Sequence, residues 1–104
     1  MERFLIVYRS APGGATETTT HDPQRWASWF DSLGSALIDR GSVTHGSVEI
    51  TTRLAGPKPI DSSLAGYSLV EAPDFYAAVR IAEQCPIFDE HGFVEIARLT
   101  GTPS

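Results

Sequence analysis

The chain has 104 residues, of which 41% are apolar and 20% are charged, with a formal net charge of −5 and an isoelectric point near 5.0. This length favours a single domain over residues 1–104 with a small core, and the composition is typical of a soluble globular protein. Because the chain is acidic and its eight lysines and arginines are scattered, it lacks the basic patch of a nucleic-acid-binding protein. We therefore expect no nucleic-acid partner.

The N-terminal segment "MERFLIVYRS" contains the first apolar run of the chain. This run is too short for the hydrophobic region of a signal peptide and far too short to span a bilayer. The single cysteine cannot form an intrachain disulfide, so nothing requires an oxidising compartment. We expect a cytoplasmic protein that has no membrane partner.

The first predicted element is a strand, "RFLIVYR", which is rich in β-branched and aromatic residues and has no glycine or proline. Its alternating faces carry Phe4, Ile6 and Tyr8 on one side and Leu5 and Val7 on the other. Since both faces are apolar, the strand is predicted to be central and covered on each side.

A loop rich in glycine, proline and threonine follows over residues 10–21, and then a helix is predicted. Asp22 can cap the first amides, Pro23 suits the first helical position, and Gly41 suits the C-terminal cap. An apolar stripe at three- and four-residue steps supports the helix; it consists of Trp26, Trp29, Phe30, Leu33 and Leu37.

The remaining elements are predicted from similar patterns. A second strand over residues 42–50 is interrupted at Gly46, and residues 51–63 are irregular, with two prolines. A third strand covers residues 64–72, a second helix runs from Pro73 to a stop at Pro86, and a last strand covers residues 92–99.

The order strand, helix, strand, strand, helix, strand is typical of the ferredoxin-like fold, βαββαβ. This α+β fold has a four-stranded antiparallel sheet with two helices on one face. The first strand is apolar on both faces, so the second face of the sheet also needs cover. A homodimer packed sheet to sheet would provide that cover.

Four segments resemble the YCII-related family, in its DGPF branch: "FLIVYR", the two tryptophans of the first helix, "GYSLVEA" and "AEQCPIFDEHGFVEIARL". They cover roughly half of the chain. The resemblance implies a dimeric α+β barrel built from two ferredoxin-like units.

The chain departs from this family in two respects. The DGPF signature survives only as Ala55-Gly56-Pro57-Lys58, and the hairpin that usually precedes it looks shortened or absent. In the YCII branch, a histidine on the first helix and an aspartate after the second helix are proposed to act together. The matching positions fall near Phe30 and on Cys85, so this pair of catalytic residues is not carried over.

The segment "CPIFDEH" collects Cys85, Asp89, Glu90 and His91, which could suggest a metal site or a reactive thiol. The spacing matches no recognised metal motif, and an exposed turn explains the acids and the histidine. Cys85 lies near a helix C-terminus, where the helix dipole disfavours a thiolate, and we expect it to be a small buried hydrophobe. We expect no metal and no cofactor.

Residues with an apolar body and a polar tip suit a ligand pocket between the sheet and the helices. Tyr8, Trp26, Trp29 and Tyr67 are the predicted ligand-binding residues, and core packing is the alternative for each. His45 lies inside the predicted second strand and is the first choice for a catalytic acid or base, because its usual pKa is near neutral. A buried structural histidine is the alternative.

Three functions remain open from the sequence. The first is binding of a small organic molecule, aromatic or polyketide-like. The second is a cofactor-independent enzyme, such as a lyase, isomerase or dehalogenase, with His45 as acid or base. The third is a non-catalytic assembly module. The sequence has no phosphate-binding loop, nucleophile elbow or catalytic triad signature.

Overall fold

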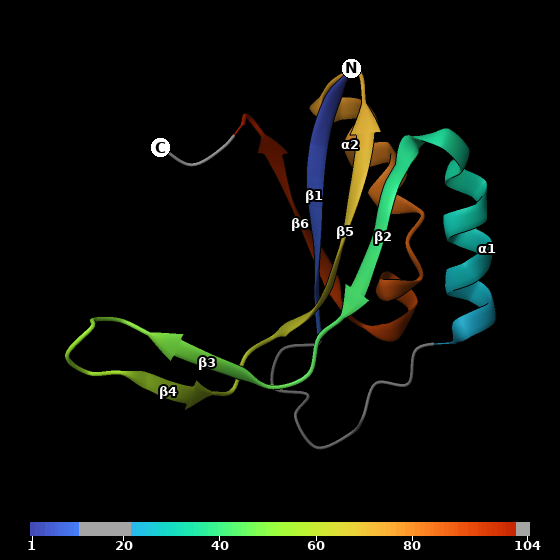
Figure 1. The fold of residues 1–104 in the computed structure, drawn as a ribbon. Helices are drawn as coiled ribbons and strands as arrows, with labels where there is room; N and C mark the ends of the chain where they lie inside the picture. Colours follow the sequence, from blue (N-terminus) through green and yellow to red (C-terminus); the bar gives the residue numbers. More distant parts are fainter. Residues whose placement is uncertain (11–21, 102–104) are drawn as a thin grey trace.

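A computed structural model describes residues 1–10 and 22–101 of the chain (Figure 1). Residues 11–21 of the loop predicted over residues 10–21, and the last three residues of the chain, lie outside the described ranges. The strands are β1 (Glu2–Arg9), β2 (Leu37–Val43), β3 (Ser47–Ile50), β4 (Pro57–Ile60), β5 (Leu64–Ala72) and β6 (Phe93–Leu99). The α-helices are α1 (Pro23–Leu33) and α2 (Phe75–Glu83), and the 3-10 turns are η1 (Gly34–Ala36) and η2 (Pro86–Glu90).

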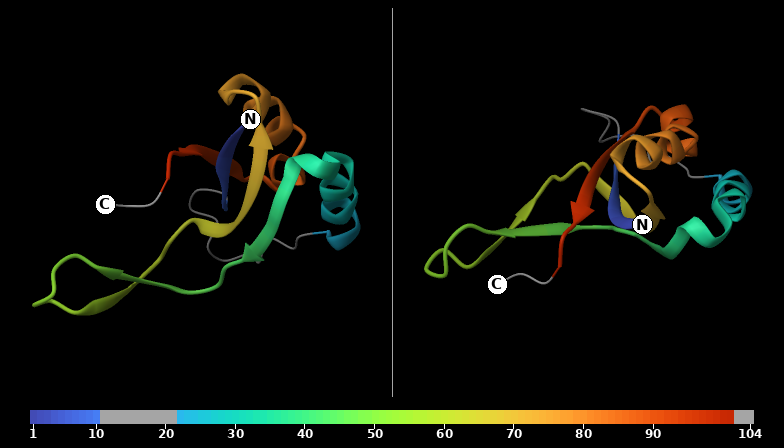
Figure 2. Two further views of the ribbon diagram at one scale, coloured as in Figure 1. Left: turned by 45° about the horizontal axis from the view of Figure 1, so that its top comes forward. Right: turned by 90° about the horizontal axis from the view of Figure 1, so that it is seen from above.

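Four strands form one antiparallel sheet in the order β2-β5-β1-β6, and β3 pairs only with β4. Both helices lie on the same side of the four-stranded sheet (Figure 2). The predicted α+β class is therefore confirmed. The central position of β1 is confirmed too, and the strand order is compatible with a ferredoxin-like arrangement.

Both helices begin as the sequence predicts. The Asp22 carboxylate accepts a hydrogen bond from the Gln24 amide, and the Asp74 carboxylate accepts one from the Ala77 amide at 2.8 Å. These caps satisfy amides that have no partner within the first turn of a helix. At its other end, α2 stops shortly before Pro86, also as predicted.

The predicted end of the first helix at Gly41 is wrong. The helix ends at Leu33, and Gly34 follows with a φ of 54° and donates its amide to the Asp31 carbonyl. After one 3-10 turn the chain is already extended at Leu37. Leu37 packs against the core from β2, whereas the sequence pattern placed it on the apolar stripe of the first helix.

The second predicted strand is divided, and residues predicted to be irregular form part of a hairpin. Thr44, His45 and Gly46 separate β2 from β3, and Gly46 adopts a φ of 79°. The β3–β4 arm, defined here as residues 47–60, projects away from the main sheet (Figure 1). The β3–β4 hairpin contains the Ala55-Gly56-Pro57-Lys58 segment, and the expectation of a shortened or absent hairpin before that segment stays a prediction. Prolines fit in β4 because it is an edge strand.

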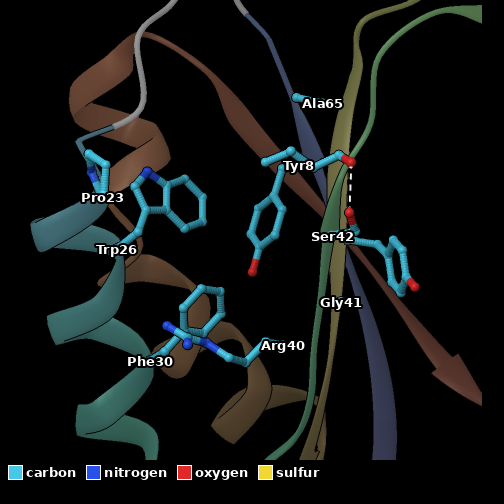
Figure 3. Close-up of a pocket in the computed structure, with 10 residues that line it drawn as sticks. Tyr8, Pro23, Trp26, Phe30, Arg40, Gly41, Ser42 and Ala65 are labelled. Atoms are coloured by element: carbon cyan, nitrogen blue, oxygen red, sulfur yellow. Dashed lines mark hydrogen bonds between the residues drawn. The ribbon is translucent and has the colours of Figure 1, made fainter.

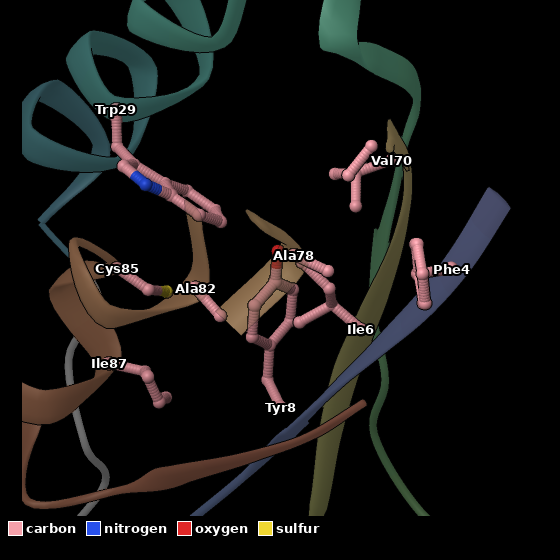
Figure 4. Close-up of a cluster of buried hydrophobic side chains, with 10 residues drawn as sticks. Phe4, Ile6, Tyr8, Trp29, Val70, Ala78, Ala82, Cys85 and Ile87 are labelled. Atoms are coloured by element: carbon pink, nitrogen blue, oxygen red, sulfur yellow. The ribbon is translucent and has the colours of Figure 1, made fainter. Parts of the chain in front are cut away.

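The core lies between the helices and the sheet face that carries the even-numbered residues of β1 (Figure 4). Its buried side chains are Phe4, Ile6, Tyr8, Trp29, Val70, Ala72, Ala78, Ala82, Cys85 and Ile87. The small alanines of α2 let this helix approach the sheet closely. Leu5 and Val7 point to the other face and are only partly buried.

Gly41 generates a testable prediction, because β2 and β5 approach closely there. It has a φ of 70°, and a Cβ atom would lie 1.9 Å from the Tyr67 carbonyl oxygen. Gly46 is a matched control, since its φ is 79° and a Cβ atom would have nothing within 4 Å. Gly46→Ala should lower the free energy of unfolding by about 1–2 kcal/mol through backbone strain alone. Gly41→Ala should lower it clearly more. Urea denaturation measures both, and equal losses would show that the close approach is absent.

Candidate functional site

A pocket of about 420 Å³ lies between α1 and the sheet, beside the edge strand β2 (Figure 3). This volume lies within the usual range for small-molecule sites. The lining residues are Tyr8, Pro23, Trp26, Phe30, Arg40, Gly41, Ser42, Val43, Ala65 and Tyr67. They come from β1, α1, β2 and β5, so no single segment of the sequence encodes the pocket.

Three rings form what we call the aromatic wall: Tyr8, Trp26 and Phe30. Trp26 and Phe30 are four residues apart, which places them on one side of α1. The ring centroids of Tyr8 and Trp26 are 4.9 Å apart in an edge-to-face arrangement, and those of Trp26 and Phe30 are 6.0 Å apart. Edge-to-face contacts are a favourable geometry for aromatic pairs, so the wall is held by its own packing.

The Tyr8 hydroxyl belongs to a hydrogen-bond chain that crosses three strands. It donates to the Ser68 Oγ at 2.7 Å, and the Ser68 hydroxyl donates to the Arg40 carbonyl at 2.6 Å. Ser68 is fully buried. Burial raises the pKa of the Tyr8 hydroxyl far above its usual value, so Tyr8 stays protonated at neutral pH and serves as a structural donor.

The Trp26 indole is fixed from outside the pocket. Its Nε1 donates to the Glu90 carboxylate at 2.8 Å, and the neighbouring Asp89 forms an ion pair with Arg25. Both acids belong to η2, the turn that follows α2. They therefore tie the start of α1 to η2, a role that the sequence did not reveal.

Three of the four predicted ligand-binding residues line the pocket: Tyr8, Trp26 and Tyr67. Alternation along β5 directs the Tyr67 side chain to the face opposite Ser68. The backbone of Tyr67 lies against Gly41, and we attribute its contribution to the lining to that backbone.

Trp29, the fourth predicted ligand-binding residue, lies in the core and is only 5% exposed. Figure 4 shows it pointing from α1 toward the sheet, near Cys85 and Ala82. Its Nε1 is buried and has no hydrogen-bond partner among the described residues. Trp29 therefore packs in the core, which was the alternative to a ligand-binding role. Its ring lies behind the aromatic wall, and the ring centroids of Trp29 and Trp26 are 5.9 Å apart.

His45 lies between β2 and β3 and is exposed, so its predicted position inside a strand is wrong. It is not among the described residues that line the pocket. A catalytic role for His45 stays a prediction that this geometry does not support.

Sequence reasoning missed Phe30 and Arg40 as pocket residues. Phe30 had a signal, because it is one helical turn beyond Trp26 on the predicted stripe. Arg40 had none, because the predicted helix extended through it. In the part of the chain that the structure describes, no group of three or more His, Cys, Asp or Glu side chains is arranged to hold a metal ion.

No protein-family model, characterised protein or solved structure gives a significant match to this chain. The resemblance to the YCII-related family therefore stays a hypothesis. Among the described residues, no helix is both long enough and apolar enough to cross a membrane.

Cys85 is a buried side chain, as predicted, and is 3% exposed. Burial raises the pKa of its thiol from 9.0 to about 12. Since the thiolate is the reactive form, this pKa lowers the reactive fraction at neutral pH by about a thousandfold.

We therefore expect a thiol reagent at pH 7.5 to label native Cys85 at least about a hundredfold more slowly than the urea-denatured chain. Cys85→Ala should lower the free energy of unfolding by roughly 1 kcal/mol, because it leaves a methyl-sized void. It should leave the pocket unchanged. Rapid native labelling at this pH would contradict the burial of the thiol.

Proposed function

We propose that the protein is a divergent YCII-related protein that binds a small organic molecule, aromatic or polyketide-like, in the pocket beside α1. The observation that carries this proposal is the unfilled space of about 420 Å³ against the aromatic wall. A concave, mainly apolar pocket of this size with few polar groups is typical of small-molecule sites. Hydrogen bonds made outside the pocket hold Tyr8 and Trp26 in place, so the wall is ready to receive a flat ring.

The geometry favours binding over turnover by a cofactor-independent lyase, isomerase or dehalogenase. Among the described residues, the lining contains no carboxylate and no imidazole. Of its two tyrosines, Tyr8 already donates its hydroxyl to Ser68, and strand alternation directs the Tyr67 side chain to the opposite face of the sheet. General acid–base catalysis needs a group that exchanges its proton near the working pH, and this lining offers none.

The binding proposal predicts a response of one tryptophan. A neutral naphthalene probe, 2-naphthamide, should shift the indole N–H resonance of Trp26 more than that of Trp29. Phe30→Ala should weaken binding of the probe about three- to tenfold, because it removes one aromatic contact. Nuclear magnetic resonance and isothermal titration calorimetry measure the two effects.

Phe88→Ala is the matched control for Phe30→Ala. Phe88 is a partly exposed phenylalanine that lines a separate groove formed by α2, η2 and β6, so its loss should leave the affinity unchanged. Equal weakening by the two variants would place the probe elsewhere, and no binding to the wild-type chain would defeat the proposal.

We also propose that the chain forms a homodimer through the sheet face that points away from the helices, which would build a dimeric α/β barrel. Tyr67, Phe93 and Leu99 are between 38% and 43% exposed on that face, beside the partly buried Leu5 and Val7. In a two-fold symmetric dimer, the same face of a second copy would cover these side chains.

The β3–β4 arm supports the same assembly. The pairing of Val48 with Pro59 and of Ile50 with Pro57 gives the arm one apolar face. Val48 and Ile50 are 63% and 65% exposed, and Leu54 near the tip is 99% exposed. An isolated two-stranded ribbon is marginally stable in water. We therefore expect the apolar face of the arm to pack on the second copy.

Light scattering at micromolar concentration should give about twice the chain mass of 11.3 kDa. Phe93→Asp should shift the protein toward the monomer, because it would place a charge in the sheet-to-sheet contact. Val48→Asp should weaken the dimer as well. Glu49→Ala, on the opposite face of the arm, and Phe88→Asp, on the helix side, are controls that should stay dimeric. A wild-type mass that stays monomeric at every concentration would contradict the assembly.

A further inference from the structure

Arg40 is the only charged side chain among the described residues that line the pocket. Its guanidinium carbon lies 4.8 Å from the centroid of the Phe30 ring. Figure 3 shows Arg40 reaching from β2 to Phe30, at the end of the pocket opposite Pro23. The Arg40 carbonyl accepts a hydrogen bond from Ser68. This bond fixes the backbone from which the Arg40 side chain extends.

Arg40 and Arg80 are the arginines of the described sheet and helices that make no ion pair with a carboxylate of the described residues, and only Arg40 of the two lines the pocket. Arg3, Arg9, Arg25 and Arg98 pair with Glu71, Glu95, Asp89 and Glu2, respectively. The chain has 13 acids for eight bases, so acidic partners are plentiful. Arg40 is exposed at the pocket and has no such partner among the described residues, so its guanidinium is available to a ligand that enters there.

Arg40 stacks on Phe30, and its guanidinium N–H groups make no hydrogen bond to another of the described residues. A planar guanidinium presents its donors as a fork that matches the two oxygens of a carboxylate. The rest of the lining is mainly aromatic and aliphatic. A ligand that satisfies both parts carries a flat ring for the aromatic wall and a carboxylate for Arg40.

We propose that the pocket selects aromatic carboxylates and that Arg40 is the residue that determines this selectivity. The inference rests on the proposed binding function, because it names the class of ligand for the same pocket. It predicts that affinity depends on the negative charge of the ligand as well as on its ring.

The test compares 2-naphthoate with 2-naphthamide, which share their size and shape and differ in charge. By calorimetry at pH 7 and low salt, the wild-type chain should bind the carboxylate about ten- to a hundredfold more tightly, the range expected for charge-assisted hydrogen bonds. Arg40→Gln should remove this preference, because it should weaken binding of the carboxylate far more than binding of the amide. Added salt should weaken only the carboxylate, because salt screens the charge.

Two further variants complete the test. Arg80→Gln is the matched control, because Arg80 also lies over an aromatic ring, that of Tyr76, at 5.5 Å on the exposed side of α2. It should leave both affinities unchanged. Arg40→Lys keeps the charge without the fork and should lose part of the preference. It also replaces Arg40→Gln if that variant fails to fold.

The outcomes separate this inference from the binding function on which it rests. If the wild-type chain binds neither probe, the binding function fails. If it binds both equally, the binding function stands and the selectivity is refuted. If Arg40→Gln weakens both probes equally, Arg40 acts only by packing on Phe30, and the selectivity is refuted as well.

Discussion

The hydrogen-bond chain from Tyr8 through Ser68 to the Arg40 carbonyl links the core to the pocket. It joins β1, β5 and β2 on the sheet face that the helices cover. Ser68 is the only polar residue among the fully buried side chains described. Its hydroxyl accepts one hydrogen bond and donates another, so its hydrogen-bonding capacity is satisfied within the core. Without this link, the Tyr8 hydroxyl would be a buried donor in apolar surroundings, which is costly. Ser68 thus holds in place both Tyr8 of the aromatic wall and the strand that carries Arg40, the one charged side chain among the described lining residues.

The position of α1 depends on contacts with the opposite end of the sequence. Glu90 and Asp89 hold Trp26 and Arg25, and both acids lie on η2, more than 60 residues further along the chain. Because α1 forms one side of the pocket, the turn after α2 sets the width of the pocket without lining it. A substitution of Asp89 or Glu90 can therefore alter ligand binding at a distance, through the position of the helix.

The sequence predicts the elements whose signals are local, and it fails where two signals compete. The strand pattern of β1 and the capping aspartates needed no tertiary information. The end of α1 was missed because Leu37 continues the helical spacing, and Gly34 and Gly41 are both suitable stops. That error hid Arg40 inside a predicted helix. The assignment of Trp29 instead of Phe30 to the pocket has a similar origin. Neighbouring residues on a helix point about 100° apart, and only the orientation of the packed helix decides which of them faces the cavity.

The irregular pairing of β2 has a consequence for how these molecules meet one another. The register between β2 and β5 shifts twice, once between Leu37 and Asp39 and again between Asp39 and Ser42. Such breaks bend a strand and spoil the regular row of amides and carbonyls along its outer edge. Since β2 ends the four-stranded sheet, this edge is a poor template for a strand from another molecule. Growth of one continuous sheet from chain to chain is therefore disfavoured on this side of the molecule.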